Sequence, residues 1–286
     1  QVDCCDLENM TKAMEGCDIV YHTAATAYEG LSVFSPVLVT RNIFEASVTT
    51  ITAAIRNKVK RIVYCSSMAR YGHHDKMPYK EDYECRPQDP YGIAKKAGED
   101  VLRNLCETHG VDYVIAVPHN IVGPRQKYDD PFRNVMSIML NRMLQGKQPI
   151  IYGDGEQQRC FSYIDDCLYC LNALAFQDNV IGEVINIGPD EEPITINELA
   201  EACANETGIN LDPIHHKDRP KEVKLAVCSS DKARDLLGYS TATNMRQSVK
   251  KTAEYIRTRG TKKFQYHLPL EILNDKTPET WKNKLI

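Results

Sequence analysis

Three short apolar runs, separated by helical patterns, constrain the fold of this 286-residue chain more than any other feature of its sequence. The runs are "DIVYHTAA" (18–25), "RIVYCSS" (61–67) and "YVIAVPHNIVGP" (113–124), and the helical patterns cover 41–57 and 91–108. Continuous apolar strands that alternate with helices predict a parallel sheet covered on both faces. Ligands of such sheets bind at the carboxyl ends of the strands. Ser66, Ser67, His119 and Asn120 all fall at such ends.

The character of the sequence changes after about residue 125. An amphipathic segment, a turn-rich stretch, a capped helix and a short helix follow: "NVMSIMLNRMLQG" (134–146), "IIYGDGEQQRCFSYI" (150–164), "TINELAEACANETG" (195–208) and "SDKARDLLGY" (230–239). We interpret the turn-rich stretch as a pair of strands. The predicted fold is α/β, with a Rossmann-like, doubly wound parallel sheet in 1–125 plus interleaved later segments, and a smaller α/β substrate-binding lobe mainly in 126–286. The tail from about Thr261, which contains Trp281, carries no clear signal.

Charge and composition narrow the classes of partner. The formal net charge is −4 and no basic run is present, so binding to nucleic acid or to an anionic membrane surface is not expected. No apolar segment approaches the ~20 residues that span a bilayer, and no signal peptide is recognised at the start. We therefore expect a soluble, cytoplasmic protein.

The eleven cysteines include an adjacent pair, Cys4 and Cys5, and a C-x-x-C, Cys167 and Cys170. The second pair falls in an apolar helical pattern, without a further pair at zinc-finger spacing. We predict reduced, buried thiols, which behave as small hydrophobic side chains in a reducing compartment, and no metal site.

The stretch "DPYGIAKKAGEDVL" (89–102) places Tyr91 and Lys95 four residues apart on a predicted helix, so both side chains share one face. A phenol titrates near pH ~10 and is a poor base at neutral pH. A nearby ammonium group favours the phenolate and would lower the pKa of the tyrosine. The spacing alone also fits an ordinary solvated helix face, so the choice depends on companion residues.

Three companions accompany this pair. Ser67 ends the preceding strand, where its hydroxyl would lie beside Tyr91. "YHTAA" (21–25) ends an earlier strand in small residues, and "PHNIVGPR" (118–125) follows the next strand. Together these motifs resemble the extended short-chain dehydrogenase/reductase family, and within it the nucleotide-sugar epimerases and dehydratases. The resemblance covers nearly the whole chain.

The resemblance implies a catalytic triad of Ser67, Tyr91 and Lys95 that acts with NAD. Tyr91 would take a proton from a sugar hydroxyl while hydride passes to the nicotinamide. Lys95 would hold the nicotinamide ribose and lower the pKa of the tyrosine. The other residues implied in NAD binding are Asp3 and Cys4 at the adenine, Thr23, Ala24, Ala25 and Pro118 along the cofactor, and Asn42 near the lysine. Asn42 also fits a simple amide on a helix surface.

The resemblance further implies substrate-binding residues for a nucleotide-diphosphate sugar. Arg159 in "YGDGEQQRCF" and Arg219 in "DRPKEVKLAV" match arginines that contact the diphosphate, and Asn120 matches an asparagine that hydrogen-bonds phosphate. Two arginines suit a pyrophosphate because each guanidinium offers a planar fork of donors. The alternative for both arginines is solvation at the surface. His119 is open to two interpretations, a contact with the sugar or a satisfied histidine at a strand end.

The residues after Ser67 bear on the reaction that the resemblance implies. Family dehydratases carry an Asp-Glu pair there and family decarboxylases a glutamate nearby, whereas this chain has Met68 and Ala69. A 4-epimerase needs no further acid–base group, because the keto sugar rotates in the pocket and receives the hydride on its other face. We therefore favour epimerisation at C4 of a UDP-hexose. Ala226 stands where family epimerases limit the pocket near the sugar C2 substituent, so a UDP-N-acetylhexosamine would also fit; alternatively, Ala226 only packs in a strand.

One family motif is absent, since no G-x-x-G-x-x-G turn, which holds the NAD pyrophosphate at a helix N-terminus, occurs in the sequence. We expect roughly 50–60 residues, the usual length of two βα units, to be missing, which would leave "DIVYH" at the sheet edge. We favour a fragment of a complete enzyme, and the alternative is a non-catalytic nucleotide-sugar-binding or dimerising remnant. A reductase, dehydratase or decarboxylase of the same family is a further alternative. By the resemblance, a homodimer is expected.

Overall fold

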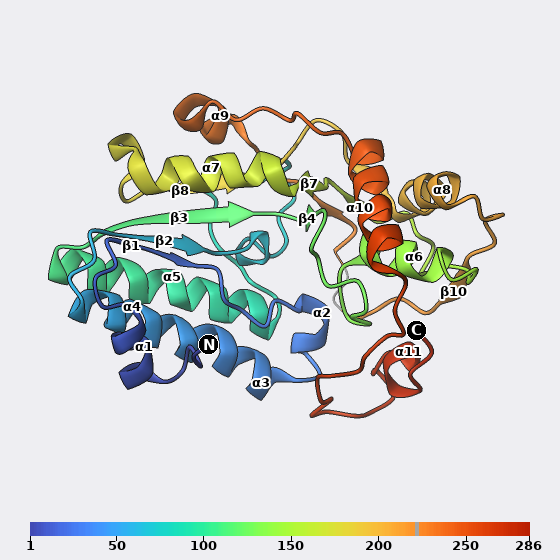
Figure 1. The fold of residues 1–286 in the computed structure, drawn as a ribbon, viewed down its shortest axis with the longest axis horizontal. Helices are drawn as coiled ribbons and strands as arrows, with labels where there is room; N and C mark the ends of the chain where they lie inside the picture. Colours follow the sequence, from blue (N-terminus) through green and yellow to red (C-terminus); the bar gives the residue numbers. More distant parts are fainter. Residues whose placement is uncertain (221–222) are drawn as a thin grey trace.

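A four-stranded parallel sheet in the order β1-β2-β3-β8 forms the centre of the computed structural model, which describes residues 1–220 and 223–286 (Figure 1). Its strands are β1 (Ile19–His22), β2 (Arg61–Cys65), β3 (Asp112–Pro118) and β8 (Val184–Ile187). The first three are the strands predicted from the apolar runs, and they pair in parallel as predicted. β1 lies at the sheet edge, also as predicted, and the side chain of Tyr21 is 42% exposed there.

Helices cover both faces of this sheet, so the fold is doubly wound (Figure 1). One face carries α1 (Leu7–Ala13), α3 (Pro36–Thr40), α4 (Ala46–Arg56) and α5 (Pro90–His109), and the other carries α7 (Ile164–Phe176) and α9 (Asp231–Leu237). Alternate residues of β2 face opposite layers: Ile62 and Tyr64 pack with α4 and α5, and Val63 and Cys65 pack with α7. Because both faces are covered, every position of β2 is buried, and the strand reads as a continuous apolar run.

The helix predicted over 91–108 is α5, which extends one residue further at each end. Asp89 caps its N-terminus, Pro90 occupies the first turn, and Gly110 ends the helix in the left-handed conformation. The helix predicted over 41–57 begins earlier than expected. α3 starts at Pro36 and continues through a π-helical turn over 41–45 into α4, because a proline is well suited to the first position of a helix.

A smaller α/β lobe packs beside the sheet (Figure 1). Its helices are α6 (Val135–Met143), α8 (Ile196–Thr207) and α10 (Met245–Arg259), which share a buried cluster that includes Met139, Leu199 and Val249. α8 is the predicted capped helix. Thr195 and Glu198 form a capping box at its start, and Gly208 ends it with a φ of 77°.

Short strands hold this lobe together, but not in the predicted way. The stretch 150–164 contains β5 (Ile150–Tyr152), β6 (Gln158–Arg159) and β7 (Ser162–Tyr163), and within the described residues none of the three pairs with another. Instead β5 pairs with β10 (Ile214–His216), β6 with β9 (Ile194–Thr195) and β11 (Leu225–Ala226), and β7 with β4 (Ile121–Val122). The predicted strand pair is therefore wrong.

Contacts with distant segments explain why these strands diverge. A β-carbon at Gly153 would lie 1.9 Å from Oδ1 of Asp218, and one at Gly155 would lie 2.1 Å from Oδ1 of Asn197. Both glycines have positive φ angles, of 70° and 76°. The turn after β5 is thus fixed by residues far away in the sequence, which a local pattern does not reveal.

All eleven cysteines are free thiols, and the C-x-x-C lies in α7 with both sulfurs buried. Burial raises the pKa of Cys167 to about 12 and that of Cys170 to about 11. The prediction of buried thiols is confirmed for these two and for Cys65, Cys106, Cys160, Cys203 and Cys228, whereas Cys17 is exposed. In the part of the chain that the structure describes, no group of three or more His, Cys, Asp or Glu side chains could hold a metal ion, and no helix is long and apolar enough to cross a membrane.

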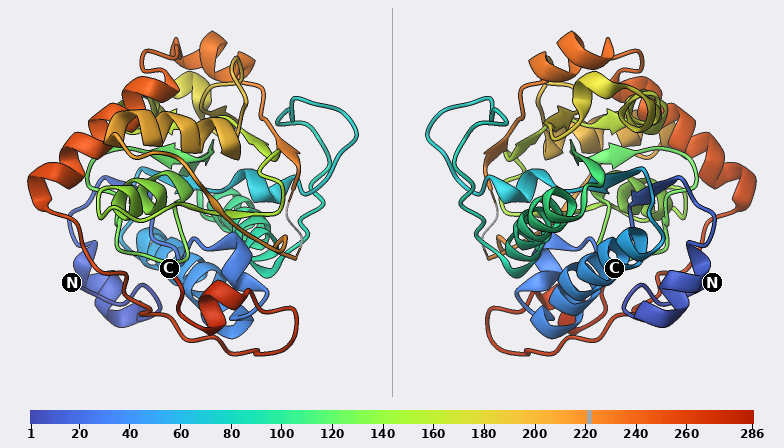
Figure 2. Two further views of the ribbon diagram at one scale, coloured as in Figure 1. Left: turned by 90° about the vertical axis from the view of Figure 1, so that its right-hand side faces the viewer. Right: turned by 90° about the vertical axis from the view of Figure 1, so that its left-hand side faces the viewer.

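The C-terminal segment 261–286, here named the C-terminal strap, packs against both the sheet layer and the smaller lobe. After α10 it runs past α2 (Glu29–Ser32) and returns through α11 (Glu279–Lys282) (Figure 2). Trp281 is 3% exposed and belongs to a buried apolar cluster with Leu31, Phe34 and Phe132. This ordered packing was not predicted from the sequence of the segment.

Candidate active site

A cavity of about 630 Å³ lies at the carboxyl ends of β1, β2 and β3, between the sheet and the smaller lobe. Its walls contain ten of the residues predicted to act in catalysis or to bind NAD or substrate, namely Thr23, Ala25, Ser67, Tyr91, Lys95, Pro118, Asn120, Arg159, Arg219 and Ala226. The fold therefore brings together side chains from strand ends, from the start of α5 and from the smaller lobe. A ligand at this position agrees with the general rule for open parallel sheets.

Four residues predicted to bind NAD lie outside the cavity walls. The carboxylate of Asp3 accepts a hydrogen bond from the backbone N–H of Cys5 at 2.9 Å, and Cys4 packs against the apolar cluster beneath the sheet. Ala24 is exposed. The amide of Asn42 donates to the hydroxyl of Thr26 at 2.9 Å, in the segment that follows β1. The roles of these residues in NAD binding stay predictions.

The start of α5 approaches the end of β2 closely enough to place Tyr91 beside Ser67. Asp89 accepts a hydrogen bond from the backbone N–H of Gly92 at 2.9 Å, which fixes the first turn of the helix. A β-carbon at Gly92 would lie only 2.7 Å from the carbonyl oxygen of Ala69. The glycine next to the tyrosine is thus required by the contact between helix and strand end, a role that sequence reasoning did not find.

Ser67 caps a short 3₁₀ turn over 68–70, where its Oγ accepts a hydrogen bond from the N–H of Ala69 at 3.2 Å. The Ser67 side chain also lies near the phenol of Tyr91, where its hydrogen bonding favours the phenolate. Met68 and Ala69 line the cavity directly after the serine and bring no titratable group to that position. The serine and the tyrosine therefore lie close together in the cavity wall, as a shared role at one substrate oxygen requires.

Lys95 is 3% exposed, and its Nζ donates to the carbonyl oxygen of Cys65 at 2.7 Å. The ammonium also lies 5.5 Å from the ring centroid of Tyr64. Burial lowers the pKa of Lys95 to about 8, while the negative potential of Cys65 and Glu99 opposes the shift. At a pH near 8, Lys95 therefore exists in both its charged and its neutral form.

The pKa of Tyr91 departs from its ordinary value in the direction opposite to the predicted one. Burial raises it, and this effect exceeds the lowering by the Ser67 hydrogen bond and by the positive charge of Arg133. The prediction attributed a lowered pKa to the nearby ammonium of Lys95. That ammonium is directed to the Cys65 carbonyl, and the depth of burial dominates.

Residues of the smaller lobe form the opposite wall. Arg159 on β6 is paired in register with Ala226 on β11, so both reach the cavity from adjacent strands. The guanidinium of Arg219 lies 4.9 Å from the ring centroid of Tyr152. Neither arginine is a purely solvated surface residue, since both line the cavity. The small side chain of Ala226 is only 7% exposed, so it is buried next to Arg159.

The residues after β3 are more constrained than predicted. The amide of Asn120 donates to the carbonyl oxygen of Cys160 at 2.9 Å, and its φ of 44° is one that asparagine tolerates. His119 is 1% exposed and its Nε2 lies 3.0 Å from the carbonyl oxygen of Pro189. Burial lowers the pKa of this histidine. His119 also lines the cavity, and within the described residues its Nδ1 has no hydrogen-bond partner, so both interpretations stay open.

Sequence reasoning missed several aromatic or charged residues of the cavity wall, among them Tyr28, Arg133 and Trp281. The phenol of Tyr28 donates to the buried carboxylate of Asp130 at 2.5 Å. Arg133 donates to the carbonyl oxygen of Ala27, and its guanidinium lies 5.9 Å from the ring centroid of Tyr28. These three residues lie in irregular segments or in a short helix, which have no period that a sequence pattern could display.

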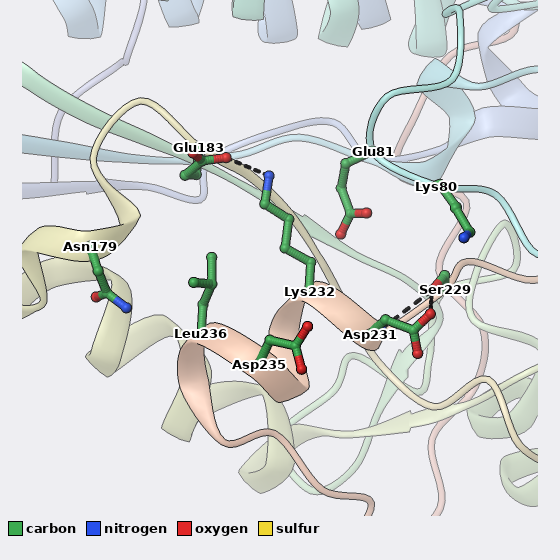
Figure 3. Close-up of a pocket in the computed structure, with 9 residues that line it drawn as sticks. All are labelled: Lys80, Glu81, Asn179, Glu183, Ser229, Asp231, Lys232, Asp235 and Leu236. Atoms are coloured by element: carbon green, nitrogen blue, oxygen red, sulfur yellow. Dashed lines mark hydrogen bonds and ion pairs between the residues drawn. The ribbon is translucent and has the colours of Figure 1, made fainter.

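A second hollow, of about 420 Å³, lies elsewhere between the loop before α5 and helix α9 (Figure 3). Its walls are mostly charged, and Lys232 forms an ion pair with Glu183 across it. The carboxylate of Glu81 accepts a hydrogen bond from the backbone N–H of Asn186. None of the predicted site residues lines this hollow, so the first cavity is the candidate active site.

The chain is similar to known proteins along most of its length. The family model described as "NAD dependent epimerase/dehydratase family" matches residues 1–188. A putative UDP-glucose 4-epimerase of Methanocaldococcus jannaschii is 30% identical over 84% of this chain and 77% of that protein. A dTDP-glucose 4,6-dehydratase of Streptomyces niveus is 27% identical over 89% of this chain and 74% of that protein.

Two solved structures share the fold along most of the chain. The UDP-glucose 4-epimerase of Thermotoga maritima, solved with UDP-glucose, superposes with a TM-score of 0.85 at 28% identity, covering 90% of this chain and 84% of that one. The UDP-glucuronic acid 4-epimerase of Bacillus cereus, solved with UDP-glucuronic acid and NAD, gives a TM-score of 0.81 at 29% identity, covering 89% and 81%. The predicted Rossmann-like fold is confirmed by these similarities.

Proposed function

The chain belongs to the NAD dependent epimerase/dehydratase family, and we propose that it epimerises a nucleotide-diphosphate sugar at C4 through a transient 4-keto sugar. The observation that carries this proposal is that Ser67, Tyr91 and Lys95 line one cavity together with Arg159 and Arg219. The hydroxyl, phenol and ammonium groups of Ser67, Tyr91 and Lys95 suit oxidation of a sugar hydroxyl. The two guanidinium groups suit a diphosphate.

The family is NAD-dependent, and the residues present fit the nicotinamide and its ribose. Lys95 has three N–H donors, of which Cys65 takes one, so the ammonium has donors for ribose hydroxyls. Thr23, Ala25 and Pro118 form a wall of small or rigid side chains at the strand ends, against which a planar ring can lie. When bound, NAD accepts the hydride from C4 of the sugar and later returns it.

The side chains of this chain then move one proton. The C4 hydroxyl would donate its proton to Oη of Tyr91 as the C4–H bond breaks, and the Ser67 hydroxyl would hold the same oxygen. Ser67 and the positive charge of Arg133 favour the phenolate that this step needs, against the effect of burial. The reverse transfer to the other face of the keto sugar gives the epimer, and no further acid or base is required.

The absence of titratable groups at Met68 and Ala69 favours epimerisation over dehydration or decarboxylation. Incubation with UDP-glucose and NAD tests this choice. We expect a product of unchanged mass with an inverted C4 in its NMR spectrum. A product lighter by one water would identify a dehydratase, and UDP-glucose binding without conversion would identify the non-catalytic module.

A small residue at Ala226 supports a wider substrate range, which we propose includes UDP-N-acetylhexosamines. Its buried side chain in the cavity wall leaves space where a larger residue would intrude. Which sugars are accepted then depends on how much of that space their C2 substituent fills.

We also propose a homodimer that buries the outer surface of α5. Val37 on α3 and Ile93 on α5 are 72% and 53% exposed, and the two helices contact each other. A second copy would remove these large apolar side chains from water. Light scattering coupled to size exclusion should give twice the chain mass of 32.4 kDa, and a monomer at every concentration would refute the dimer.

A further inference from the structure

The C-terminal strap connects the two walls of the cavity. On the smaller lobe, its backbone N–H at Lys262 donates to Asn141 at 3.0 Å, and that at Gln265 donates to the carbonyl oxygen of Asp129 at 2.9 Å. On the sheet side, the carboxylate of Glu271 accepts hydrogen bonds from the backbone N–H groups of Val37 and Leu38, both at 2.9 Å. The strap is therefore held at the N-terminus of α3 as well as on the smaller lobe (Figure 2).

Trp281 of the strap reaches into the cavity wall from this anchored position. Its indole contacts Phe34 and Phe132 edge to face, with ring centroids 6.1 and 5.4 Å apart. The same residue, with the C-terminal Ile286, lines the cavity. An aromatic ring fixed on two sides by other rings is a rigid surface, which costs little conformational entropy when a ligand contacts it.

The indole and the guanidinium of Arg219, which is proposed to bind the diphosphate, both approach Gly30. A ring carbon of Trp281 and Nη1 of Arg219 lie 3.5 and 3.6 Å from the same point, the position of a β-carbon at Gly30. The guanidinium of Arg219 also stacks over Tyr152, whose hydroxyl is hydrogen-bonded to Thr280, the neighbour of Trp281. Aromatic rings and a guanidinium group thus share one end of the cavity.

We propose that the C-terminal strap forms part of the nucleoside diphosphate site and that Trp281 contacts the bound nucleotide. This inference rests on the proposed function and adds a binding element to it. A guanidinium group suits the phosphates, and flat aromatic surfaces suit the ribose or base. The strap is hydrogen-bonded to both walls of the cavity. A nucleotide bound against it would therefore contact a segment that is anchored to the sheet layer and to the smaller lobe.

Trp281 is the single tryptophan of the chain, so its intrinsic fluorescence reports on this wall alone. Titration of the native chain with UDP should give a saturable change in tryptophan emission, with the same midpoint as a calorimetric titration. Trp281→Leu should weaken UDP binding about five- to tenfold, which corresponds to the loss of one aromatic contact. Phe176→Leu, on the exposed end of α7, is the matched control and should leave the affinity unchanged.

Two results separate the failure of this inference from that of the proposed function. In the first, the native chain binds UDP and Arg219→Ala lowers the affinity for UDP, but UDP does not change the tryptophan emission and Trp281→Leu binds UDP with the native affinity. The strap is then not part of the site, and the inference is overturned. If the native chain does not bind UDP at all, both the inference and the proposed nucleotide-sugar function fail. The emission measurement uses the native chain, so it decides the question even where Trp281→Leu does not fold.

Discussion

Nζ of Lys95 lies 2.7 Å from the carbonyl oxygen of Cys65, and this contact joins the cavity side of α5 to the end of β2. This hydrogen bond holds a buried cation one helical turn after Tyr91. The side chain is fixed, but its charge is not, because burial brings the pKa of Lys95 down to about 8. Charge and position of this lysine can therefore be tested separately.

The pH dependence of catalysis should follow the charge of Lys95. Below pH 8 the charged ammonium of Lys95 can donate charge-assisted hydrogen bonds to the nicotinamide ribose; above it the charge is lost, so kcat/KM should fall. In Lys95→Arg the guanidinium keeps its charge, and the alkaline fall near pH 8 should disappear even if the maximum rate is lower. Profiles from about pH 6 to 10 measure both. An identical alkaline fall in the two proteins would assign it to another group.

Lys95 should also lower the stability of the fold at neutral pH. Its pKa changes from 10.5 to about 8 on burial, so the penalty is fully present below pH 8 and is lost as pH rises toward 10.5. Lys95→Met should raise the free energy of unfolding by on the order of 1–2 kcal/mol at pH 7, after loss of the Cys65 hydrogen bond. Urea unfolding measures the difference, with Lys96→Met as control. A gain that persists unchanged at pH 11 would contradict this explanation.

A buried ion pair supports the same helix. Nη2 of Arg70 lies 2.9 Å from Oε2 of Glu99, whose other oxygen accepts a hydrogen bond from Ser66, and the two side chains are 4% and 0% exposed. Arg70→Met should destabilise the protein by about 3–5 kcal/mol because it leaves a buried carboxylate without its cation. Arg70→Met with Glu99→Met should recover most of this loss. If the double variant were as unstable as the sum of the single variants, the pair would not be coupled.

Ala226 should decide whether an N-acetyl group is accepted. Ala226→Tyr should reduce turnover of UDP-N-acetylglucosamine by about tenfold or more and leave that of UDP-glucose within a few-fold. Leu225→Tyr is the control on the same strand, since Leu225 is 37% exposed and does not line the cavity. Equal turnover of UDP-N-acetylglucosamine by the native protein and Ala226→Tyr would remove Ala226 as a determinant.

The sequence predicted those parts of the fold that depend on local patterns. The strands around Val63 and Ile115 follow from apolar runs, and the helix over 91–108 and the end of α8 at Gly208 follow from helical patterns and a capping glycine. The pairing of β5, β6 and β7 was predicted wrongly, because their partners lie far away in the sequence.

The candidate site was predictable to a similar degree. Ser67, Tyr91 and Lys95 belong to ordered motifs at strand and helix ends, and the fold brings them together. Arg133 and Trp281 were missed, because irregular segments carry no period. The direction of the Tyr91 pKa was also missed, since it depends on burial, which is set by tertiary packing rather than by the spacing to Lys95.

The fate of hydrogen at the sugar carbons tests the central claim most directly. Conversion of UDP-galactose in deuterated water, with NAD and with Tyr91→Phe as control, should give UDP-glucose that contains no carbon-bound deuterium, because the same hydride leaves C4 and returns to it. Tyr91→Phe should lose at least about a hundredfold in rate. Deuterium at C3 or C5, or conversion by Tyr91→Phe at the native rate, would contradict a C4 epimerisation that depends on Tyr91.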